Sequence, residues 1–225
     1  MKQIEVKGLT KSYTNGNITY NILRGIDFDV ESGEFISICG PSGSGKTTLL
    51  YTLSGLESHQ GGEVLWFGKE ISAMGDQEKA NMRAHDMGFV FQFFNLIPNL
   101  TVYENVMLAS VIGKQKSKDE IMYYLELVGL KHQHDLYPNQ LSGGMQQRVS
   151  IARALVNEPK VLFADEPIGN LDHQNGIQIM ELFQKLNQTL QLTILMVTHN
   201  EDVTRYGSRI IYMQDGKVIK DERII

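Results

Sequence analysis

The sequence has 225 residues, of which 42% are hydrophobic and 21% charged, a composition that permits a sizeable buried core and excludes extensive disorder. The formal net charge of −5 argues against general nucleic-acid binding, and the single cysteine excludes an internal disulfide. From this charge we expect no nucleic-acid partner. No stretch reaches the roughly 18 consecutive apolar residues of a spanning helix, so we also expect no direct membrane insertion. If the protein works at a membrane, a partner must hold it there.

The opening segments are predicted to form strands. Apolar and polar residues alternate over residues 3–7 and within residues 18–30, as they do in strands with one buried face. Residues 34–39 form a short apolar run, which is typical of a strand buried on both faces. A glycine-rich segment ends this strand, and a helix is expected from Lys46 to about Gly55.

That glycine-rich segment, Gly40–Thr47 (GPSGSGKT), matches the P-loop pattern G-x-x-x-x-G-K-[ST]. Glycine lets the backbone wrap around a phosphate, and the positive end of the next helix faces the same anion. Lys46 is expected to contact the β- and γ-phosphates, and Thr47 to offer its hydroxyl to Mg²⁺. We therefore predict a site for ATP and Mg²⁺. Its predicted nucleotide contacts are Gly40, Ser42, Gly43, Ser44, Gly45, Lys46, Thr47 and Thr48.

The middle of the chain, roughly residues 93–156, is predicted to be mainly helical. Ser117 and Glu120 form an S-x-x-E capping box at the start of one helix, and Gly129 is expected to end it. The apolar positions in this helix have helical spacing: Ile121, Leu125 and Val128. A second helix is expected to begin at Ser142. Its apolar face comprises Met145, Val149, Ala152 and Val156.

The last part of the chain is predicted to return to a β-α-β pattern. Residues 160–164 and 192–197 are expected to be buried strands, with a helix between them over residues 173–190. Such a unit implies parallel strands and a right-handed crossover. Residues 210–213 and 217–219 flank Asp215-Gly216, a typical hairpin turn. We therefore predict an α/β core interrupted by a helical insertion.

Two adjacent carboxylates, Asp165 and Glu166, follow the apolar run at residues 161–164. A buried strand would fix Asp165 at its carboxyl end, near the P-loop, where it could hold Mg²⁺. Because side chains alternate along a strand, Glu166 can have a different task, and it is our candidate to polarise the attacking water. Without the P-loop, a solvated strand end would be the better interpretation of this pair.

The segment Leu141–Gln147 (LSGGMQQ) resembles the signature motif of ATP-binding-cassette (ABC) ATPases. Ser142 would cap the helix and supply a hydroxyl, while Gly143 and Gly144 leave backbone N–H groups open to a phosphate. Alone, this segment could be a plain N-capped helix. The segment lies between the P-loop and Asp165 along the chain, and this motif order and spacing favour the signature motif over a plain capped helix.

The resemblance to ABC ATPases extends over nearly the whole chain. It implies an adenine-stacking role for Tyr13, a Q-loop glutamine at Gln92, a D-loop over residues 169–172 ending in Asp172, and a switch histidine at His199. The implied catalytic residues are Glu166, His199 and Gln92. The implied Mg²⁺ ligands are Thr47, Gln92 and Asp165, and the implied nucleotide contacts add Tyr13, Ser142, Gly143, Gly144 and Asp172 to the P-loop.

The resemblance also implies a fold and an assembly. The fold is a P-loop NTPase (RecA-like) core with an N-terminal antiparallel β subdomain and an inserted α-helical subdomain. One domain spans residues 1–225, with residues 1–91 and 157–225 in the core and residues 92–156 in the Q-loop and helical signature subdomain. Two copies are expected to pair head to tail on ATP and to drive an integral membrane permease at the cytoplasmic face of the cell membrane.

Residues 89–105 and 165–172 most resemble the LolD/MacB-type branch, as do the short length and the lack of a C-terminal regulatory domain. The expected function is to power export of a peptide, antibiotic, drug or lipoprotein. The alternative is a regulatory ATPase of the FtsE type, which acts on cell-wall remodelling without solute transport. A soluble DNA-repair or translation ATPase fits less well, because the charge is acidic and no long heptad run is present. A P-loop kinase would not need the Leu141–Gln147 segment.

Several residues differ from those most common in the family at the same positions, and others lie outside the predicted site. Met145, Ile168 and Asn200 replace residues that are more common at their positions. The pair His132 and His134 is best explained as a solvated loop, since no further ligands stand at a suitable spacing. Cys39 is expected to pack as a small apolar residue. The apolar stretch at residues 91–100 either packs the helical subdomain or receives a permease.

Overall fold

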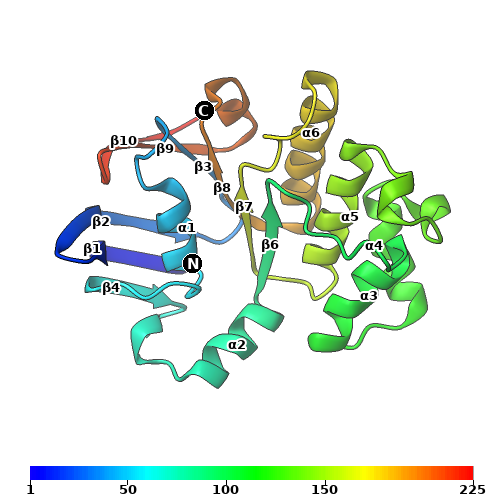
Figure 1. Ribbon diagram of the computed structural model, residues 1–225, viewed down its shortest axis with the longest axis horizontal. Coiled ribbons are helices and arrows are strands. Elements are labelled where there is room, and N and C mark those ends of the chain that lie inside the picture. The colour runs from blue at the N-terminus through cyan, green and yellow to red at the C-terminus, as the bar shows by residue number, and fades with distance from the viewer. Residues whose placement is uncertain (225) are drawn as a thin grey trace.

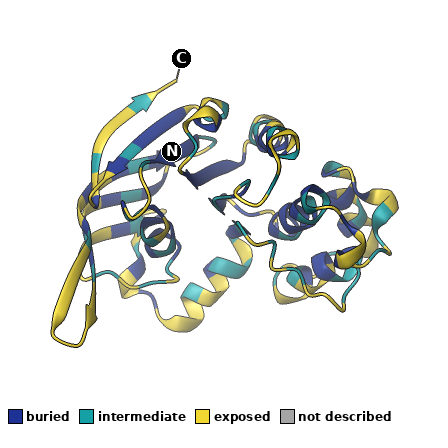
Figure 2. Cartoon of the chain, turned by 45° about the horizontal axis from the view of Figure 1, so that its top comes forward, coloured by how far each residue is buried: buried dark blue, intermediate teal, exposed yellow. Residues whose placement is uncertain are grey.

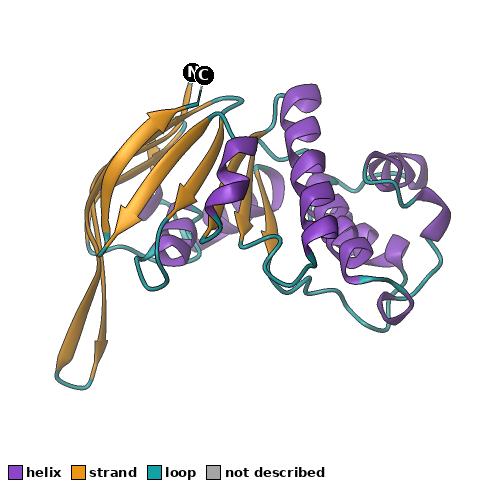
Figure 3. Cartoon of the chain, turned by 90° about the horizontal axis from the view of Figure 1, so that it is seen from above, coloured by secondary structure: helices purple, strands orange, loops and turns teal. Residues whose placement is uncertain are grey.

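The computed structural model describes residues 1–224 and contains two sheets with a group of helices at one end (Figure 1). The four-stranded sheet has the order β2-β1-β4-β5 and is antiparallel. Its strands are β1 (Lys2–Asn15), β2 (Ile18–Glu31), β4 (Gly61–Trp66) and β5 (Lys69–Glu70). The predicted strands at residues 3–7 and 18–30 are therefore confirmed. They are longer than expected, and the end of the β1–β2 hairpin projects from the body (Figure 3).

The six-stranded sheet forms the centre of the molecule and has the order β10-β9-β3-β8-β7-β6. Its strands are β3 (Phe35–Cys39), β6 (Met87–Phe91), β7 (Val161–Asp165), β8 (Thr193–Thr198), β9 (Arg209–Gln214) and β10 (Lys217–Arg223). All neighbours are parallel except β9 and β10, which form the hairpin predicted at Asp215-Gly216. Both turn residues have positive φ, as this tight turn requires.

Alternate residues of the central strands face two separate hydrophobic cores. In β7, Leu162 and Ala164 belong to the core under the helical region, whereas Val161 and Phe163 belong to the core shared with the antiparallel sheet. Burial on both faces explains why these strands are continuous apolar runs. Figure 2 shows the central strands as buried, while the projecting hairpin is exposed.

Helices connect the parallel strands and position the loops between them. The helix α1 (Lys46–Leu53) follows β3, and α6 (His173–Leu190) links β7 to β8, as the β-α-β pattern predicts. Asp172 caps α6 by accepting a hydrogen bond from the Asn175 backbone N–H. Among residues 1–224, no helix combines the length and the apolar character that crossing a bilayer requires.

The helical insertion contains α3 (Val102–Ile112), α4 (Lys118–Leu127) and α5 (Gly143–Leu155), with short 3-10 helices η2 (Lys131–Gln133) and η3 (Pro138–Gln140). The predicted capping box at Ser117 and Glu120 is present, and α5 begins after its cap, Ser142. Residues 93–101 are irregular rather than helical. The buried amide of Asn105 holds this segment by donating to the carbonyls of Ile97, Leu100 and Thr101.

The part of the chain before β6 contains elements that the sequence did not predict. They are β4, β5, the 3-10 helix η1 (Ile71–Ala73) and α2 (Asp76–His85). Met82 is the one buried residue of α2, so the helix has no apolar stripe by which a periodic pattern could reveal it. A last 3-10 helix, η4 (Glu201–Tyr206), follows β8.

Candidate functional site

Four neighbouring parallel strands of the central sheet end at one level, and a functional segment follows each of them. The register pairs their last residues: Cys39 with Thr198, Val197 with Asp165, and Asp165 with Phe91. The P-loop follows β3, His199 follows β8, Glu166 follows β7, and Gln92 follows β6. The carboxyl edge of a parallel sheet is where ligands bind in this class of fold. Sheet topology therefore brings together segments that are far apart in the sequence.

The P-loop depends on glycine at two close approaches. A Cβ atom on Gly40, which has φ of 155°, would lie 2.0 Å from the Met213 carbonyl oxygen. A Cβ atom on Gly45, which has φ of 96°, would lie 3.1 Å from the Ile22 carbonyl oxygen. Any side chain would force this loop away from its neighbours. The loop is thus held close to β2 and β9 in a conformation that requires glycine at these two positions.

The Lys46 amine lies over this loop. Its Nζ atom donates to the carbonyl oxygens of Gly40, at 2.8 Å, and Pro41, at 2.9 Å. A cavity of about 300 Å³ opens beside it. The cavity is lined by Ile22, Ser42, Gly43, Gly45, Lys46, Thr47, Thr48, Glu166 and His199. The structure therefore brings six of the eight predicted P-loop contacts together with two of the three predicted catalytic residues, whereas Gly40 and Ser44 do not line the cavity. Sequence analysis did not identify Ile22 as a lining residue, because it is one of many apolar strand positions.

Two side chains of α1 hold the Asp165 carboxylate. Thr47 Oγ1 donates to Asp165 Oδ1 at 3.0 Å, and Tyr51 Oη donates to Asp165 Oδ2 at 3.0 Å. Burial raises the pKa of Asp165, while the hydrogen bonds from Thr47 and Tyr51 oppose that rise. Burial and the nearby Asp165 raise the pKa of Tyr51 to about 12, so the phenol keeps its proton and donates. The sequence did not predict a role for Tyr51.

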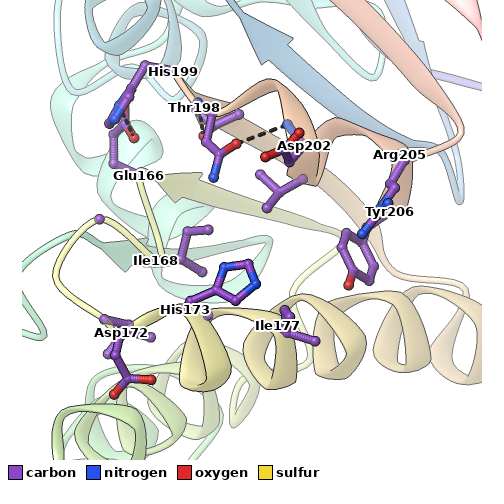
Figure 4. Close-up of a pocket in the computed structure, with 15 residues that line it drawn as sticks. Glu166, Ile168, Asp172, His173, Ile177, Thr198, His199, Asp202, Arg205 and Tyr206 are labelled. Atoms are coloured by element: carbon purple, nitrogen blue, oxygen red, sulfur yellow. Dashed lines mark hydrogen bonds and ion pairs between the residues drawn. The ribbon is translucent and has the colours of Figure 1, made fainter.

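Glu166, which follows Asp165, adopts a left-handed backbone with φ of 48°. Such a conformation costs a residue other than glycine about 1–2 kcal/mol, so it has to be held in place. The Glu166 N–H donates to the Val197 carbonyl at 3.0 Å, and the Glu166 carboxylate lies 2.8 Å from His199 Nδ1 (Figure 4). The two carboxylates at the end of β7 therefore have different hydrogen-bond partners. This arrangement is compatible with the different tasks that the sequence predicts for them.

A larger cavity of about 560 Å³ lies beside the smaller one, between the start of α6 and η4 (Figure 4). Its walls include the apolar side chains of Ile168, Ile177 and Tyr206. Glu166 and His199 line both cavities. The contact between Glu166 and His199 therefore stands at the boundary between the P-loop cavity and this second space.

Gln92 does not line either of these cavities. Its Nε2 atom donates to Asn170 Oδ1 at 3.3 Å, and Asn170 Nδ2 donates to the Gln92 carbonyl at 3.0 Å. The amide thus ties the end of β6 to the loop that follows β7. The structure does not bring Gln92 into contact with Thr47 or Asp165, its expected companions around Mg²⁺.

Tyr13 lies on β1, outside the residues that line the P-loop cavity. Its hydroxyl is hydrogen-bonded to Glu57, and the Lys11 amine lies 4.9 Å from the centre of its ring. Partial burial and the Glu57 contact raise the pKa of Tyr13, whereas a hydrogen bond with Thr48 acts in the opposite direction. The ring is therefore anchored beside the first turn of α1, with 40% of the residue exposed.

The segment Ser142–Gly144 lies at the start of α5, across β7 from α1 (Figure 1). Ser142 Oγ accepts a hydrogen bond from the Met145 N–H at 3.3 Å. A Cβ atom on Gly144 would lie 2.5 Å from Asn175 Oδ1, so glycine is needed where α5 meets α6. None of these residues lines the P-loop cavity of its own chain.

Asp172 also stands apart from the P-loop cavity. Its two carboxylate oxygens accept hydrogen bonds from the backbone N–H and the side-chain amide of Asn175, at 2.9 and 2.7 Å. These bonds lower the pKa of Asp172. The carboxylate is thus occupied in capping α6, beside the beginning of α5.

The buried amide of Gln147 connects α5 to the site. Its Nε2 atom donates to the carbonyl of Phe91, at 3.3 Å, and to that of Pro167. These carbonyls adjoin Gln92 and Glu166 in the sequence. The helix that begins with Ser142 is therefore coupled to the ends of both β6 and β7.

The remaining sequence candidates lie elsewhere. His134 contacts the Lys131 carbonyl and Asp135, and residues 1–224 hold no group of three side chains suited to a metal cage. Cys39 is buried, and burial raises the pKa of its thiol.

Comparison with known proteins identifies the same architecture. The family model described as "ABC transporter" matches residues 23–169. The lipoprotein-releasing system ATP-binding protein LolD of Cytophaga hutchinsonii is 46% identical over 204 residues, covering 89% of this chain and 93% of that protein. The macrolide export ATP-binding/permease protein MacB of Chlorobium phaeobacteroides is 43% identical over 222 residues, covering 98% of this chain. The chain spans only 34% of that relative's length.

Solved structures agree with the sequence relatives. The dimeric structure of MJ0796, a bacterial ABC transporter cassette, superposes with a TM-score of 0.89 at 40% identity, covering 99% of both chains. A post-hydrolysis state of MJ0796 bound to ADP and Pi gives a TM-score of 0.90 at 39% identity, again covering 99% of both chains. The predicted fold class, an α/β core with an antiparallel β subdomain and a helical insertion, is confirmed.

Proposed function

This chain belongs to the ABC transporter family and is an ATPase, and from that premise we propose that it drives a separate membrane permease that exports a peptide, antibiotic, drug or lipoprotein. One observation carries the mechanism. The P-loop, Glu166 and His199 surround a single cavity, whereas Ser142–Gly144 lies outside it in the same chain. The nucleotide site is therefore half built, and a second copy supplies the rest.

The P-loop cavity suits ATP with Mg²⁺. Gly43, Gly45 and Lys46 offer backbone N–H groups to the phosphates, and the Lys46 amine adds a cation. The Thr47 hydroxyl and the Asp165 carboxylate are hard oxygen donors of the kind that Mg²⁺ selects. Mg²⁺ would neutralise charge on the β- and γ-phosphates. Tyr13 would stack on the adenine.

Glu166 and His199 have the geometry of a base and its orienting partner. Glu166 accepts a proton from the attacking water as the water oxygen bonds to the γ-phosphorus and the bond to ADP breaks. His199 holds the Glu166 carboxylate at 2.8 Å and is 64% exposed on its side chain, so it can turn toward a γ-phosphate. Gln92 would join them after release from Asn170.

Two copies would pair head to tail. Ser142, Gly143 and Gly144 of one copy would cover the phosphates bound by the P-loop of the other, with Asp172 of the D-loop at the same interface. The ability of a related cassette to form a dimer supports this arrangement. Hydrolysis would remove the contacts to the γ-phosphate and let the pair open.

The surface for the permease would lie beside the Q-loop. Phe93 and Ile112 are large apolar residues with 69% and 68% exposure, and Val111 beside them is also exposed. Ile112 also lines a groove of about 350 Å³ between α2 and the α3–α5 region, together with Met87 and Phe89. Exposed apolar patches of this kind mark interaction sites.

The permease would hold the protein at the cytoplasmic face of the cell membrane. Residues 92–156 would move as the signature subdomain against a core of residues 1–91 and 157–225.

The names of the LolD and MacB relatives, a lipoprotein-releasing system and a macrolide exporter, support the export assignment. The test is to purify the tagged chain from its native membranes in mild detergent and to identify its partners by mass spectrometry. We expect a stoichiometric membrane permease with a large external domain. Recovery of the chain with cell-division proteins would instead establish the regulatory alternative, and recovery of the chain alone would contradict the permease assignment. A Phe93→Ser variant should lose the partner while keeping ATP binding.

A further inference from the structure

We propose that Tyr51 is a positioning residue that orients Asp165 for the divalent cation of the nucleotide. This inference rests on the proposed function, since it assumes that Asp165 and Thr47 hold that cation. No feature of the sequence marks Tyr51, because it lies outside the P-loop pattern, on the helix that follows it. The evidence is the hydrogen-bonding geometry around the Asp165 carboxylate.

Thr47 and Tyr51 lie one turn apart on α1, so their side chains project from one face of the helix. Each donates to a different oxygen of Asp165, at 3.0 Å in both cases. With the Thr47 bond alone, the carboxylate could pivot about its Cβ–Cγ bond. The second bond, at Oδ2, fixes the plane of the carboxylate and therefore the direction of its remaining lone pairs.

The Tyr51 side chain is itself firmly placed. Its ring is half-buried and packs against the core between α1 and the central sheet. Its carbonyl oxygen accepts the N–H groups of Leu56 and Glu57, at 3.0 and 3.1 Å, and the hydroxyl of Ser54. A donor that is anchored on both its ring and its backbone can impose its geometry on a partner.

The two bonds differ in what happens when a cation is present. Thr47 would coordinate the cation through an oxygen lone pair while its proton continues to point to Asp165. Tyr51 donates to the other carboxylate oxygen, Oδ2, and would hold the carboxylate rather than act as a ligand. Removing the Tyr51 hydroxyl should therefore weaken cation binding through Asp165 alone. Loss of such an outer partner typically costs about 10–100-fold in metal affinity.

The chain offers a matched control. Tyr124 Oη donates to Glu158 Oε1 at 3.1 Å in the helical insertion, which is the same type of bond at a position remote from the P-loop cavity. The variants Tyr51→Phe and Tyr124→Phe each remove one hydroxyl and one bond to a carboxylate while keeping the ring. A purely structural role for Tyr51 would make the two variants behave alike.

The experiment measures the affinity for Mn²⁺, a paramagnetic substitute for Mg²⁺, by electron paramagnetic resonance. The protein is in excess over a non-hydrolysable ATP analogue. Calorimetry in EDTA measures the affinity of the protein for the analogue in the absence of metal. We expect Tyr51→Phe to bind Mn²⁺ about ten-fold more weakly than wild type, with unchanged analogue affinity in EDTA, and Tyr124→Phe to match wild type. Unchanged Mn²⁺ affinity in Tyr51→Phe, or an equal loss of analogue affinity in EDTA, would overturn the proposal. Wild-type protein that adds nothing to the Mn²⁺ affinity of the free analogue would instead overturn the proposed metal site itself.

Discussion

The residues at the P-loop edge of the central sheet and those at the start of α5 are positioned by different kinds of contact. At the sheet edge, strand register fixes the P-loop, Glu166 and His199 around one cavity within a single chain. At the start of α5, Ser142 and Gly144 are placed by a helix cap and by packing against Asn175, and they face no nucleotide cavity of their own chain. The first region thus forms a cavity within one chain, whereas under the proposed head-to-tail pairing the second would complete another copy's site. Gln147 connects the two regions, so a change in one can be transmitted to the other.

Removing the proposed base tests the first region most severely. In Glu166→Gln the amide keeps the shape of the side chain but cannot take a proton from water. We expect ATP turnover to fall by about 10²–10⁴-fold, because general-base catalysis contributes on that scale. ATP affinity, measured by calorimetry, should change little, and an ATP-dependent dimer should persist. Near-normal turnover in this variant would assign water activation to another group.

Removing the P-loop cation should have the next largest effect. In Lys46→Ala the phosphates lose a charge-assisted partner, and the Gly40 and Pro41 carbonyls lose the amine that they share. We expect nucleotide affinity to fall by roughly 10–100-fold, the equivalent of one hydrogen bond to a charged group. Calorimetric titration with ADP measures this directly. An unchanged affinity would exclude Lys46 from phosphate binding.

A signature variant should separate the two regions. In Ser142→Ala we expect nucleotide affinity of the single chain to remain at the wild-type value, because Ser142 lies outside its P-loop cavity. ATP-dependent dimer formation in the Glu166→Gln background, measured by light scattering, should weaken several-fold. The lost cap should also lower stability by about 1 kcal/mol. A fall in nucleotide affinity of the isolated chain would contradict the division of roles.

The smallest effect concerns the helical insertion alone. In Ser117→Ala the capping box of α4 is lost, and we expect the free energy of unfolding to fall by about 1 kcal/mol with no change in ATP affinity. Hydrogen bonds from Ser117 also lower the pKa of Glu120 to about 2, below its ordinary value of 4.5. A lowered folded-state pKa stabilises the fold above the ordinary value, and this contribution is lost as the pH falls from about 4.5 to about 2. Urea titrations at neutral pH and at pH 3 should therefore show a smaller difference between variant and wild type in acid.

The sequence predicts elements well where periodicity and end signals agree. The α6 helix spans the predicted residues 173–190, because Asp172 caps its start and the apolar residues Ile177, Met180, Phe183 and Leu186 follow at helical spacing. By contrast, α2 escaped prediction because it buries little more than Met82, and β4 begins with two glycines, which weakens its strand pattern. Motifs of adjacent residues identify which groups are present but not which distant groups they contact.

The parts of the site that escaped prediction are therefore its long-range pairs. Tyr51 and Asp165 are separated by 114 residues, and Gln92 and Asn170 by 78, and each pair is created only by the order of the strands. The expectation that Gln92 faces the metal rests on family resemblance, and in this structure its amide is bonded to Asn170 instead. Ile22 likewise reaches the cavity because β2 passes beside Gly45.

The central claim, that one chain's signature segment completes the other's P-loop, has a direct test. Ser42 and Ser142 are both exposed, and Cys39 is buried, so a Ser42→Cys/Ser142→Cys variant in the Glu166→Gln background presents two reactive thiols. With ATP and a mild oxidant, the account predicts a covalent dimer joined at these positions, whereas either single-cysteine variant stays monomeric on a non-reducing gel. A crosslink formed within one chain, or none with ATP while ATP still binds, would contradict the head-to-tail site.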